Sequence, residues 1–488
     1  MDPDAKLRNY DVIIIGAGVS GVNAGYRLLS QAPGTRFVIL ESRGSIGGTW
    51  DLFRYPGIRS DSDVFTFGFA WSPWHRQETL AQAADIKAYM VNAAKETGVD
   101  KHIIFHRKVL SANWTTSKQR WEVLVQEKDQ QEPVVYRGRF IFLGTGYYNY
   151  EQPRKVLIPG IENFKGKVIH PQFWPENYDY TDKEMVVIGS GATAVTIVPA
   201  VAGNVKQVTM LQRSPGYMIS IANRSKIRRC LSAILPSAIV HRINRTYWIT
   251  FTYLLTILCA KWPTMVRDLI RRENIKLLPK GYSWDPHFKP RYMPWDERLC
   301  AVPDGDIFTA IRSSKAVVVT DTIDTITEDS VKLTSGKSLH ADVIVTATGI
   351  SLLFAGGIRF TTDDVPFDPS KKFVWNAAMI QDLPNVVFSL GYLKSGSWTL
   401  GADCAAQLLI RLMKQLQKRS ATSITPYIDD ATVMESRPLW GLLKSGYLKG
   451  YENQFPQTST GIWCNRDNYI KDMYAARWGD IETGLRYH

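Results

Sequence analysis

The stretch Gly16-Ala17-Gly18-Val19-Ser20-Gly21 follows the apolar run Asp11-Val12-Ile13-Ile14-Ile15. This order predicts a strand, a tight glycine-rich turn and the start of a helix, which together present backbone N–H groups to a pyrophosphate. A second strand, predicted over residues 37–40, ends at Glu41, where a carboxylate is placed to bind ribose hydroxyls. We therefore interpret residues 11–41 as a βαβ unit for a dinucleotide. Its candidate ligands are Gly16, Gly18, Ser20, Gly21 and Glu41.

A second turn of the same kind lies about 170 residues further on, as Gly189-Ser190-Gly191-Ala192-Thr193-Ala194 after Met185-Val186-Val187-Ile188. The next predicted strand, 208–211, ends at Gln212-Arg213-Ser214 and lacks the acidic residue. A guanidinium binds a 2′-phosphate through two hydrogen bonds, whereas a carboxylate would repel it. The first site is therefore predicted for FAD and the second for NADPH, with redox chemistry between them. The candidate NADPH ligands are Gly189, Ser190, Gly191, Ala192, Thr193, Ala194, Val195, Arg213 and Ser214. Alternatively, Arg213 is a surface arginine without a role.

The length of 488 residues fits two or three domains. Two further apolar runs, 140–143 and 343–345, end in small residues, where we expect the chain to cross between domains. We predict an α/β fold with two doubly wound Rossmann-like domains. The FAD domain takes residues 1–150 and 340–488, and the NADPH domain, 151–339, is inserted in it. Within the inserted domain we expect a helical insertion at about 224–280. A core-facing helix is predicted from the apolar spacing of residues 405–416.

The formal net charge is +13, without a motif typical of nucleic-acid binding. An anionic cofactor explains part of the excess, and an anionic membrane surface is the other interpretation of interest. The five cysteines have neither metal nor redox spacing, so we predict no metal site and a reducing, cytoplasmic compartment. Residues 246–260 carry no charge but are shorter than the ~20 residues that span a bilayer. They are predicted to form a buried helix, and peripheral membrane contact stays open because their flanks are basic.

Two segments between the two turns are more distinctive. One is Gly47-Gly48-Thr49-Trp50-Asp51-Leu52-Phe53-Arg54-Tyr55-Pro56-Gly57-Ile58-Arg59-Ser60-Asp61. The other, Phe164-Lys165-Gly166-Lys167-Val168-Ile169-His170-Pro171-Gln172-Phe173-Trp174-Pro175, matches F-x-G-x-x-x-H-x-x-x-W-P at every fixed position. These segments resemble the fingerprint of Baeyer–Villiger monooxygenases, which are class B flavoprotein monooxygenases. Trp295-Asp296-Glu297-Arg298-Leu299-Cys300 and Trp398-Thr399-Leu400 resemble the ethionamide-activating subgroup.

The resemblance implies that NADPH reduces FAD and that the reduced flavin and O2 form a C4a-peroxyflavin. This species attacks a ketone, and a carbon migrates to give an ester or a lactone. The implied substrates are O2 and a small apolar ketone or thioether. The resemblance leaves the oligomeric state open.

Site residues also follow from the resemblance. Arg298 is the candidate cation for a peroxide anion, whose stabilisation in a dry site is worth several kcal/mol. This chain has Asp296-Glu297-Arg298 where the cyclohexanone-oxidising pattern has Lys-Arg-Pro, so Arg298 is displaced by one position. The alternative is a structural ion pair of Arg298 with Glu297 or another carboxylate. Asp61 is expected near the flavin and this arginine, and Arg59 and Ser60 at the nicotinamide cofactor. The remaining implied FAD contacts are Thr49, Trp50, Asp51, Leu52 and Val109. His170 is expected to act in a hinge or in packing rather than in catalysis.

Three rival functions share some of these features. A sulfur- or nitrogen-oxygenating flavin monooxygenase uses the same two cofactors. A disulfide reductase needs a pair such as Cys-x-x-x-x-Cys, which this chain lacks. A non-catalytic flavoprotein sensor would not couple NADPH oxidation to oxygen transfer. Within the helical insertion, the aromatic residues Tyr247, Trp248, Phe251 and Tyr253 suit either an apolar substrate or a membrane-facing surface.

Overall fold

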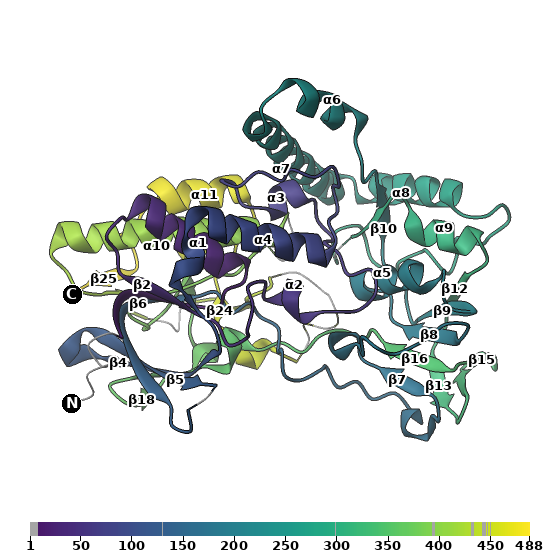
Figure 1. The fold of residues 1–488 in the computed structure, drawn as a ribbon, viewed down its shortest axis with the longest axis horizontal. Coiled ribbons are helices and arrows are strands. Elements are labelled where there is room, and N and C mark those ends of the chain that lie inside the picture. The colour runs from purple at the N-terminus through teal and green to yellow at the C-terminus, as the bar shows by residue number, and fades with distance from the viewer. Residues whose placement is uncertain are drawn as a thin grey trace.

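A nine-stranded sheet forms the first half of the fold in the computed structural model, which describes residues 8–128, 130–297, 299–392, 396–430, 434–441, 446, 448 and 450–488 (Figure 1). Its strands run in the order β18-β17-β4-β5-β6-β1-β2-β3, and β21 also pairs with β6. They are β1 (Asn9–Ile15), β2 (Phe37–Leu40), β3 (Ile103–Ile104), β4 (Arg107–Thr115), β5 (Arg120–Glu127), β6 (Val134–Leu143), β17 (Arg359–Thr362), β18 (Val365–Pro366) and β21 (Val386–Phe388). β6, β1, β2 and β3 are parallel, whereas β4, β5 and β6 form an antiparallel meander.

The helices α1 (Val19–Gln31) and α10 (Trp398–Arg419) pack against the parallel part of this sheet. In a further layer, α4 (Ala83–Thr97) packs on α1, and α11 (Tyr469–Trp478) packs on α10. The helix predicted over 405–416 is confirmed within α10, whose Leu408, Leu409 and Leu412 are at most 1% exposed. A buried ion pair between Arg27 of α1 and Asp403 of α10 (2.8 Å) fixes the two helices to each other.

The second sheet has five strands, all parallel, in the order β12-β9-β8-β16-β7. They are β7 (Lys167–Ile169), β8 (Glu184–Ile188), β9 (Gln207–Gln212), β12 (Ala316–Thr320) and β16 (Val343–Thr346). The helices α5 (Ala192–Val201) and α9 (Asp306–Arg312) pack beside it. A small antiparallel sheet adjoins it, made of β13 (Ile323–Ile326), β14 (Ser330–Leu333) and β15 (Ser338–His340).

The second sheet is nested in the first, because its strands fall between β6 and β17 in the chain. The predicted α/β class with two Rossmann-like sheets is confirmed. The domain limits stay a prediction. β16, which ends at Thr346, pairs with β7 and β8 of the second sheet.

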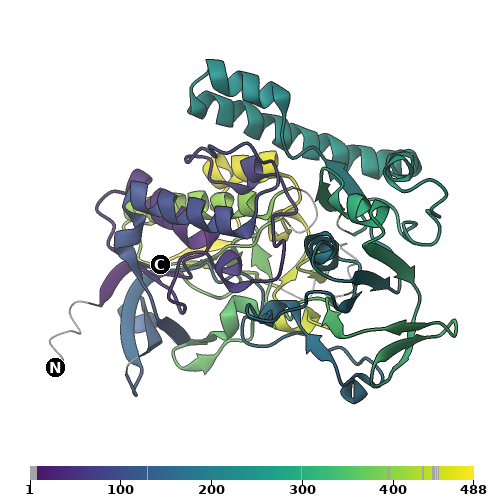
Figure 2. The ribbon, with the colours of Figure 1, turned by 45° about the vertical axis from the view of Figure 1, so that its right-hand side comes forward.

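Three helices project from the second sheet: α6 (Lys226–Ile234), α7 (Ser237–Lys261) and α8 (Pro263–Leu277) (Figures 1 and 2). The strands on either side of them, β10 (Met218–Ile221) and β11 (Cys300–Pro303), pair in parallel. The helices occupy the segment expected to be an insertion. The prediction of a buried helix over residues 246–260 is wrong, because in this part of α7 only Cys259 is buried. The C-terminal segment adds the short strands β19 (Val374–Trp375), β20 (Met379–Ile380), β22 (Ile424–Pro426), β23 (Arg437–Pro438), β24 (Gln457–Thr458) and β25 (Leu485–Tyr487).

Candidate functional site

The first glycine-rich turn joins β1 to α1, and its glycines are required by close backbone contacts. Gly16 has φ +101°, and a Cβ added there would lie 2.7 Å from the carbonyl oxygen of Gly144, at the end of β6. A Cβ on Gly21 would lie 1.8 Å from the carbonyl oxygen of Gly16. Gly18 caps α1 and faces the backbone of Gly48, with no side chain between them. The N-terminus of α1 is therefore an uncovered backbone cradle of the kind that holds a pyrophosphate.

Glu41 ends β2 and binds the turn directly. Its carboxylate accepts hydrogen bonds from the N–H groups of Ala17 (2.7 Å) and Arg43 (2.8 Å). Burial raises the pKa of Glu41, against the opposing effect of these hydrogen bonds. The acidic residue predicted to bind a ribose is thus held at the turn, and the two together fit the adenosine end of FAD.

The segment predicted to lie along FAD begins at α2 (Thr49–Leu52), which follows Gly48. The Thr49 hydroxyl lies 3.0 Å from the Tyr150 hydroxyl, and Trp50 packs its ring edge-on against Phe67. Asp51 is 4% exposed and accepts hydrogen bonds from Lys87 (2.6 Å) and Arg43 (2.7 Å). Burial acts to raise its pKa, but these two cations outweigh burial and lower it. The Asp51 carboxylate thus anchors α2 to the protein.

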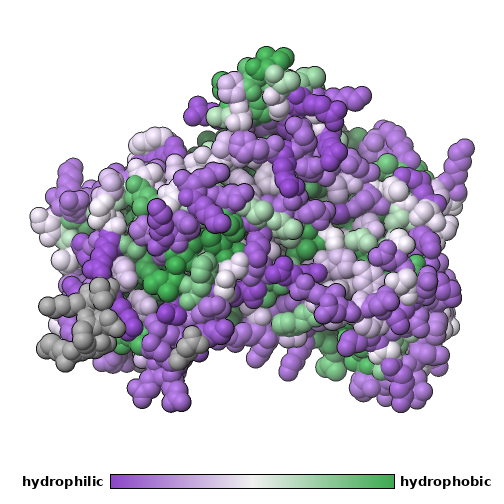
Figure 3. Space-filling model, in the orientation of Figure 1, coloured by the Kyte–Doolittle hydropathy of each residue, from purple (hydrophilic) through white to green (hydrophobic). Residues whose placement is uncertain are grey.

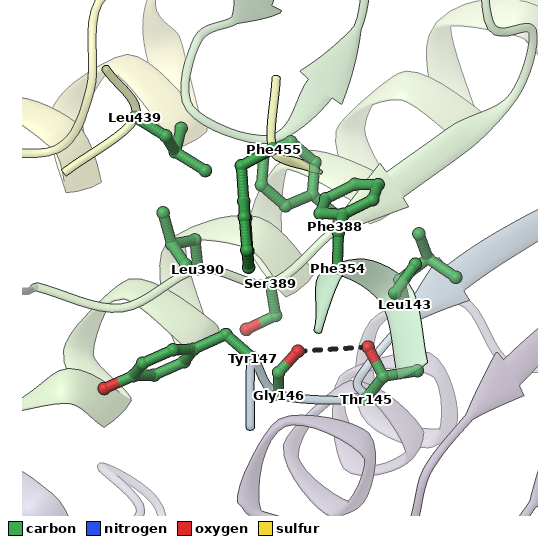
Figure 4. A pocket seen from close by; sticks show the side chains of 11 residues that line it. Leu143, Thr145, Gly146, Tyr147, Phe354, Phe388, Ser389, Leu390, Leu439 and Phe455 are labelled. Carbon is green, nitrogen blue, oxygen red and sulfur yellow. Dashed lines mark hydrogen bonds between the residues drawn. The ribbon is translucent and has the colours of Figure 1, made fainter. Parts of the chain in front are cut away.

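The other predicted FAD contacts have different surroundings. Leu52 is half-buried, and Val109, a residue of β4, is buried in the hydrophobic core to which β4 and β5 contribute. Ser20 accepts a hydrogen bond from the hydroxyl of Ser389 (3.0 Å), the residue that follows β21. Ser389 also lines a pocket at the carboxyl ends of β6 and β21 (Figure 4). Apolar side chains dominate this pocket: Leu143, Phe354, Phe388, Leu390, Leu439 and Phe455.

The second turn repeats the backbone contacts of the first. Gly189 has φ +143°, and a Cβ there would lie 2.3 Å from the carbonyl oxygen of Ala347, which follows β16. Gly191 caps α5, and a Cβ there would meet nothing within 4 Å. The Ser190 hydroxyl donates to the carbonyl of Ser214 (2.8 Å), which ties the turn to the end of β9. The backbone thus leaves open space at the N-terminus of α5, as a second pyrophosphate requires.

The remaining predicted ligands of this site divide by position. Ala192 is exposed and Thr193 is half-buried at the start of α5, whereas Ala194 and Val195 are buried in the core of the second sheet. Arg213 is exposed just beyond β9, where a 2′-phosphate would lie in a Rossmann fold.

The Arg59–Asp61 segment crosses toward the second sheet. The guanidinium of Arg59 pairs with the carboxylate of Asp306, at the start of α9. The Ser60 hydroxyl donates to the carbonyl of Ser62 (2.7 Å), and Asp61 is half-buried. Arg59, expected at the nicotinamide cofactor, thus binds a carboxylate of the second domain in this structure.

Tyr55 connects the segment 47–61 to the start of α5. Burial raises its pKa to about 12, against a hydrogen bond with the Thr193 side chain, while the negative charge of Asp61 acts in the same direction as burial. The phenol is therefore protonated at neutral pH and can donate a hydrogen bond. Tyr55 and Thr193 also line a cavity between the sheets, together with Phe53, His170, Thr346 and Gly349.

His170 faces this cavity from the linker after β7. Its Nδ1 accepts a hydrogen bond from the N–H of Gln172 (3.2 Å), and burial lowers its pKa. A neutral imidazole that caps a short turn fits the expected packing role. Arg298 lies outside the described residues, so its place relative to Asp61 stays a prediction.

Several residues of the site were not predicted from the sequence. Tyr150 and Ser389 contact the first site through hydroxyl groups, and Asp306 holds Arg59. None of the three lies in a recognisable motif. Tyr55 belongs to the quoted segment 47–61, and its position in that motif was the available signal.

Comparison with known proteins agrees with this geometry. Residues 72–248 match the flavin-binding monooxygenase-like family, and residues 14–83 match an NAD(P)-binding Rossmann-like domain. The chain is 41% identical to the FAD-containing monooxygenase EthA of Mycobacterium tuberculosis over 479 residues, which cover 98% of this chain and 97% of that protein.

Two solved structures share the fold. An oxidized steroid monooxygenase bound to NADP has a TM-score of 0.74 at 19% identity, over 98% of this chain and 99% of that one. A cyclohexanone monooxygenase bound to ε-caprolactone has a TM-score of 0.75 at 18% identity, over 98% and 100% of the two chains. With an EthA relative at 41% identity over almost its whole length, the chain belongs to the family of FAD-containing monooxygenases, as its sequence predicts.

Proposed function

We propose that this protein is an NADPH- and O2-dependent flavin monooxygenase of Baeyer–Villiger type, which converts an apolar ketone to an ester or a lactone. In the balanced reaction, one atom of O2 enters the bond beside the carbonyl and the other leaves as water. NADPH supplies the two electrons, and one proton is taken up. Bound FAD would supply the chemistry by accepting hydride from NADPH and activating O2.

The contact between Tyr55 and Thr193 carries this proposal. It joins the segment 47–61, which resembles the flavin-contacting segment of the family, to the second glycine turn, and both residues line one cavity. A nicotinamide held by α5 and a flavin held by α1 would lie on the two sides of this contact. The steroid monooxygenase that shares this fold binds NADP, and the exposed Arg213 offers the guanidinium that a 2′-phosphate would need.

The proposed roles of the residues follow from their chemistry. The backbone N–H groups after Gly16–Gly21 and Gly189–Ala194 would bind the two pyrophosphates. Glu41 would bind the FAD ribose. The protonated Tyr55 would orient Asp61 and Thr193 at the mouth of the nucleotide site. Arg298 would stabilise negative charge that develops on the transferred oxygen, and Asp61 would fix the position of that guanidinium.

The related fold of cyclohexanone monooxygenase holds a lactone, which favours a ketone as substrate. Oxygenation of a thioether is the second candidate. The sequence resembles the ethionamide-activating subgroup, and the chain is far more similar to EthA than to the solved ketone monooxygenases. Peripheral contact with a membrane surface is a separate proposal, which rests on the charge and exposed apolar residues of the helices α6–α8.

Aerobic turnover tests the function. The purified holoenzyme, NADPH and a panel of cyclic, linear and steroid ketones should give esters or lactones, with one labelled oxygen atom from 18O2 in each product. A matched thioether panel gives sulfoxides if the second candidate holds. Arg298→Ala should abolish oxygen transfer while NADPH oxidation continues with release of hydrogen peroxide, and Arg298→Lys should restore part of the transfer. NADPH oxidation without an oxygenated product from either panel would contradict the proposal.

A further inference from the structure

The helices α6–α8 have an unusual charge. Residues 226–280 contain eleven Lys and Arg but only two acidic residues, Asp268 and Glu273, a net charge of +9 out of +13 for the whole chain. No acidic residue occurs between Lys226 and Arg267. Cation excess of this density creates a positive potential that attracts anionic partners. The rest of the chain also has a positive net charge, +4, so a second copy of this chain offers no net negative charge to complement the insertion.

The outer side of α7 carries an apolar stripe. Ile239, Ile243, Tyr247, Phe251 and Leu254 recur every three or four residues, and each is at least 40% exposed. On α6, Ile227 and Ile234 are 74% and 79% exposed and lie seven residues apart, on one face of that helix. The projecting end of this insertion is visibly apolar (Figure 3). Exposed apolar side chains among basic residues are typical of helices that lie in the interface of a membrane.

The inner side of α7 is anchored to the first domain. Arg245 donates to the carbonyls of Phe65 (2.8 Å) and Gly68 (2.9 Å), which end the short helix α3 (Val64–Phe67). His241, one turn earlier, lies 3.2 Å from the carbonyl oxygen of Phe69. The apolar stripe on the outer side of α7 is therefore not the core-facing surface of this helix, because the opposite side of α7 packs against the first domain.

The geometry excludes a simple transmembrane arrangement for this pair of helices. No helix in the described part of the chain is both long and apolar enough to cross a bilayer alone. α7 and α8 pass that test only together, and they are bent by 115°. Because α7 is fixed along its inner side by Arg245 and His241, it can lie on a membrane but cannot be inserted across one.

We propose that α6 and α7 dock on the surface of an anionic lipid bilayer. The isoleucines and aromatic rings of the stripe enter the acyl boundary, and Arg229 and Arg242, both exposed, bind lipid headgroups. The docked α7 holds α3, which follows Asp61 by three residues. An apolar substrate dissolved in the bilayer would thus be presented next to the candidate site.

Vesicle flotation with the purified holoenzyme tests this proposal. We expect the protein to float with vesicles of phosphatidylcholine mixed with phosphatidylserine, but not with pure phosphatidylcholine, and to be released by salt. Arg229→Gln with Arg242→Gln should weaken binding by about 30-fold. Ile239→Ser with Ile243→Ser should abolish it. The matched controls Lys315→Gln with Lys337→Gln, and Leu157→Ser, change exposed residues outside the insertion and should bind like the wild type.

Two outcomes would overturn the proposal. One is equal flotation of wild type and both insertion variants. The other is a wild-type protein that binds no anionic vesicle, including one that forms a dimer lost in Ile239→Ser with Ile243→Ser, since the stripe would then be a protein–protein surface. Flotation does not depend on oxygen transfer, so its failure is distinguishable from failure of the proposed function. Turnover of a water-soluble substrate without vesicles should be the same in all variants.

Discussion

At the scale of single residues, the two glycines of each turn have different roles. One is required by the backbone conformation, and the other leaves space for a ligand. Gly189 has a positive φ and no room for a Cβ beside Ala347, whereas Gly191 has neither constraint. The first glycine is therefore needed for the chain to fold, and the second for the space in front of α5 that a pyrophosphate would occupy. The same division holds for Gly16 and Gly18 in the first turn.

We therefore predict different outcomes for two alanine substitutions in the second turn. Gly189→Ala should destabilise the protein by about 2 kcal/mol or more, because strain and a backbone clash add together. Gly191→Ala should leave the melting temperature unchanged but raise the KM for NADPH by about tenfold or more. Differential scanning fluorimetry and NADPH kinetics measure both effects. Unchanged NADPH kinetics in a folded Gly191→Ala variant would show that α5 does not hold the nucleotide.

At the scale of elements, α1 is positioned by α10. Asp403 accepts hydrogen bonds from Arg27 at 2.8 and 3.0 Å and from the side-chain amide of Asn23 at 3.1 Å, all buried. Because the N-terminus of α1 is the proposed site of the FAD pyrophosphate, this cluster would link packing of the core to the cofactor. An uncompensated buried charge is costly, so the cluster matters more than ion pairs at the surface.

Asp403→Ala should lower the free energy of unfolding by about 3 kcal/mol, since Arg27 would lose its partner inside the protein. We also expect FAD to dissociate more readily. Asp382→Asn, which removes the partly exposed pair with Lys372 and tolerates the positive φ at this position, is the matched control and should cost less than about 1 kcal/mol. Denaturant unfolding and flavin release on dialysis measure these effects. Equal losses in the two variants would disprove the link between α1 and α10.

The anchor of α7 should depend on pH. Burial lowers the pKa of His241 to about 4, and the positive charge of Arg245 and of His75 act in the same direction. Its Nδ1 has no hydrogen-bond partner among the described residues. The unfolded chain takes up a proton near pH 6.5 and the folded one only near pH 4, so this residue favours the folded state above about pH 6.5.

As the pH falls from about 6.5 to about 4, the free energy of unfolding of the wild type should therefore drop by up to about 3 kcal/mol more than that of His241→Gln. Thermal melts of both proteins between about pH 7 and about pH 4.5 provide the comparison. Parallel curves for the two proteins would mean that His241 is not held neutral by its surroundings.

At the scale of the whole molecule, the sequence could predict what local chemistry encodes. The glycine turns, Glu41 and the helix over 405–416 were predicted because short-range contacts or a repeating apolar pattern required those residues. The pairing of Tyr55 with Thr193 and of Arg59 with Asp306 could not be predicted, because each joins residues more than a hundred positions apart and no local pattern specifies the partner. The outward direction of Tyr247 and Phe251 likewise depends on which side of α7 binds α3.

The central claim is that one chain holds a flavin and NADPH so that the second reduces the first. Anaerobic mixing of the purified flavoprotein with NADPH tests it most directly, by the loss of the visible absorbance of the flavin. We predict rapid bleaching in the wild type and strongly slowed bleaching in Gly191→Ala, with full bleaching of both proteins by dithionite. A wild-type flavin that dithionite bleaches and NADPH does not would contradict the account.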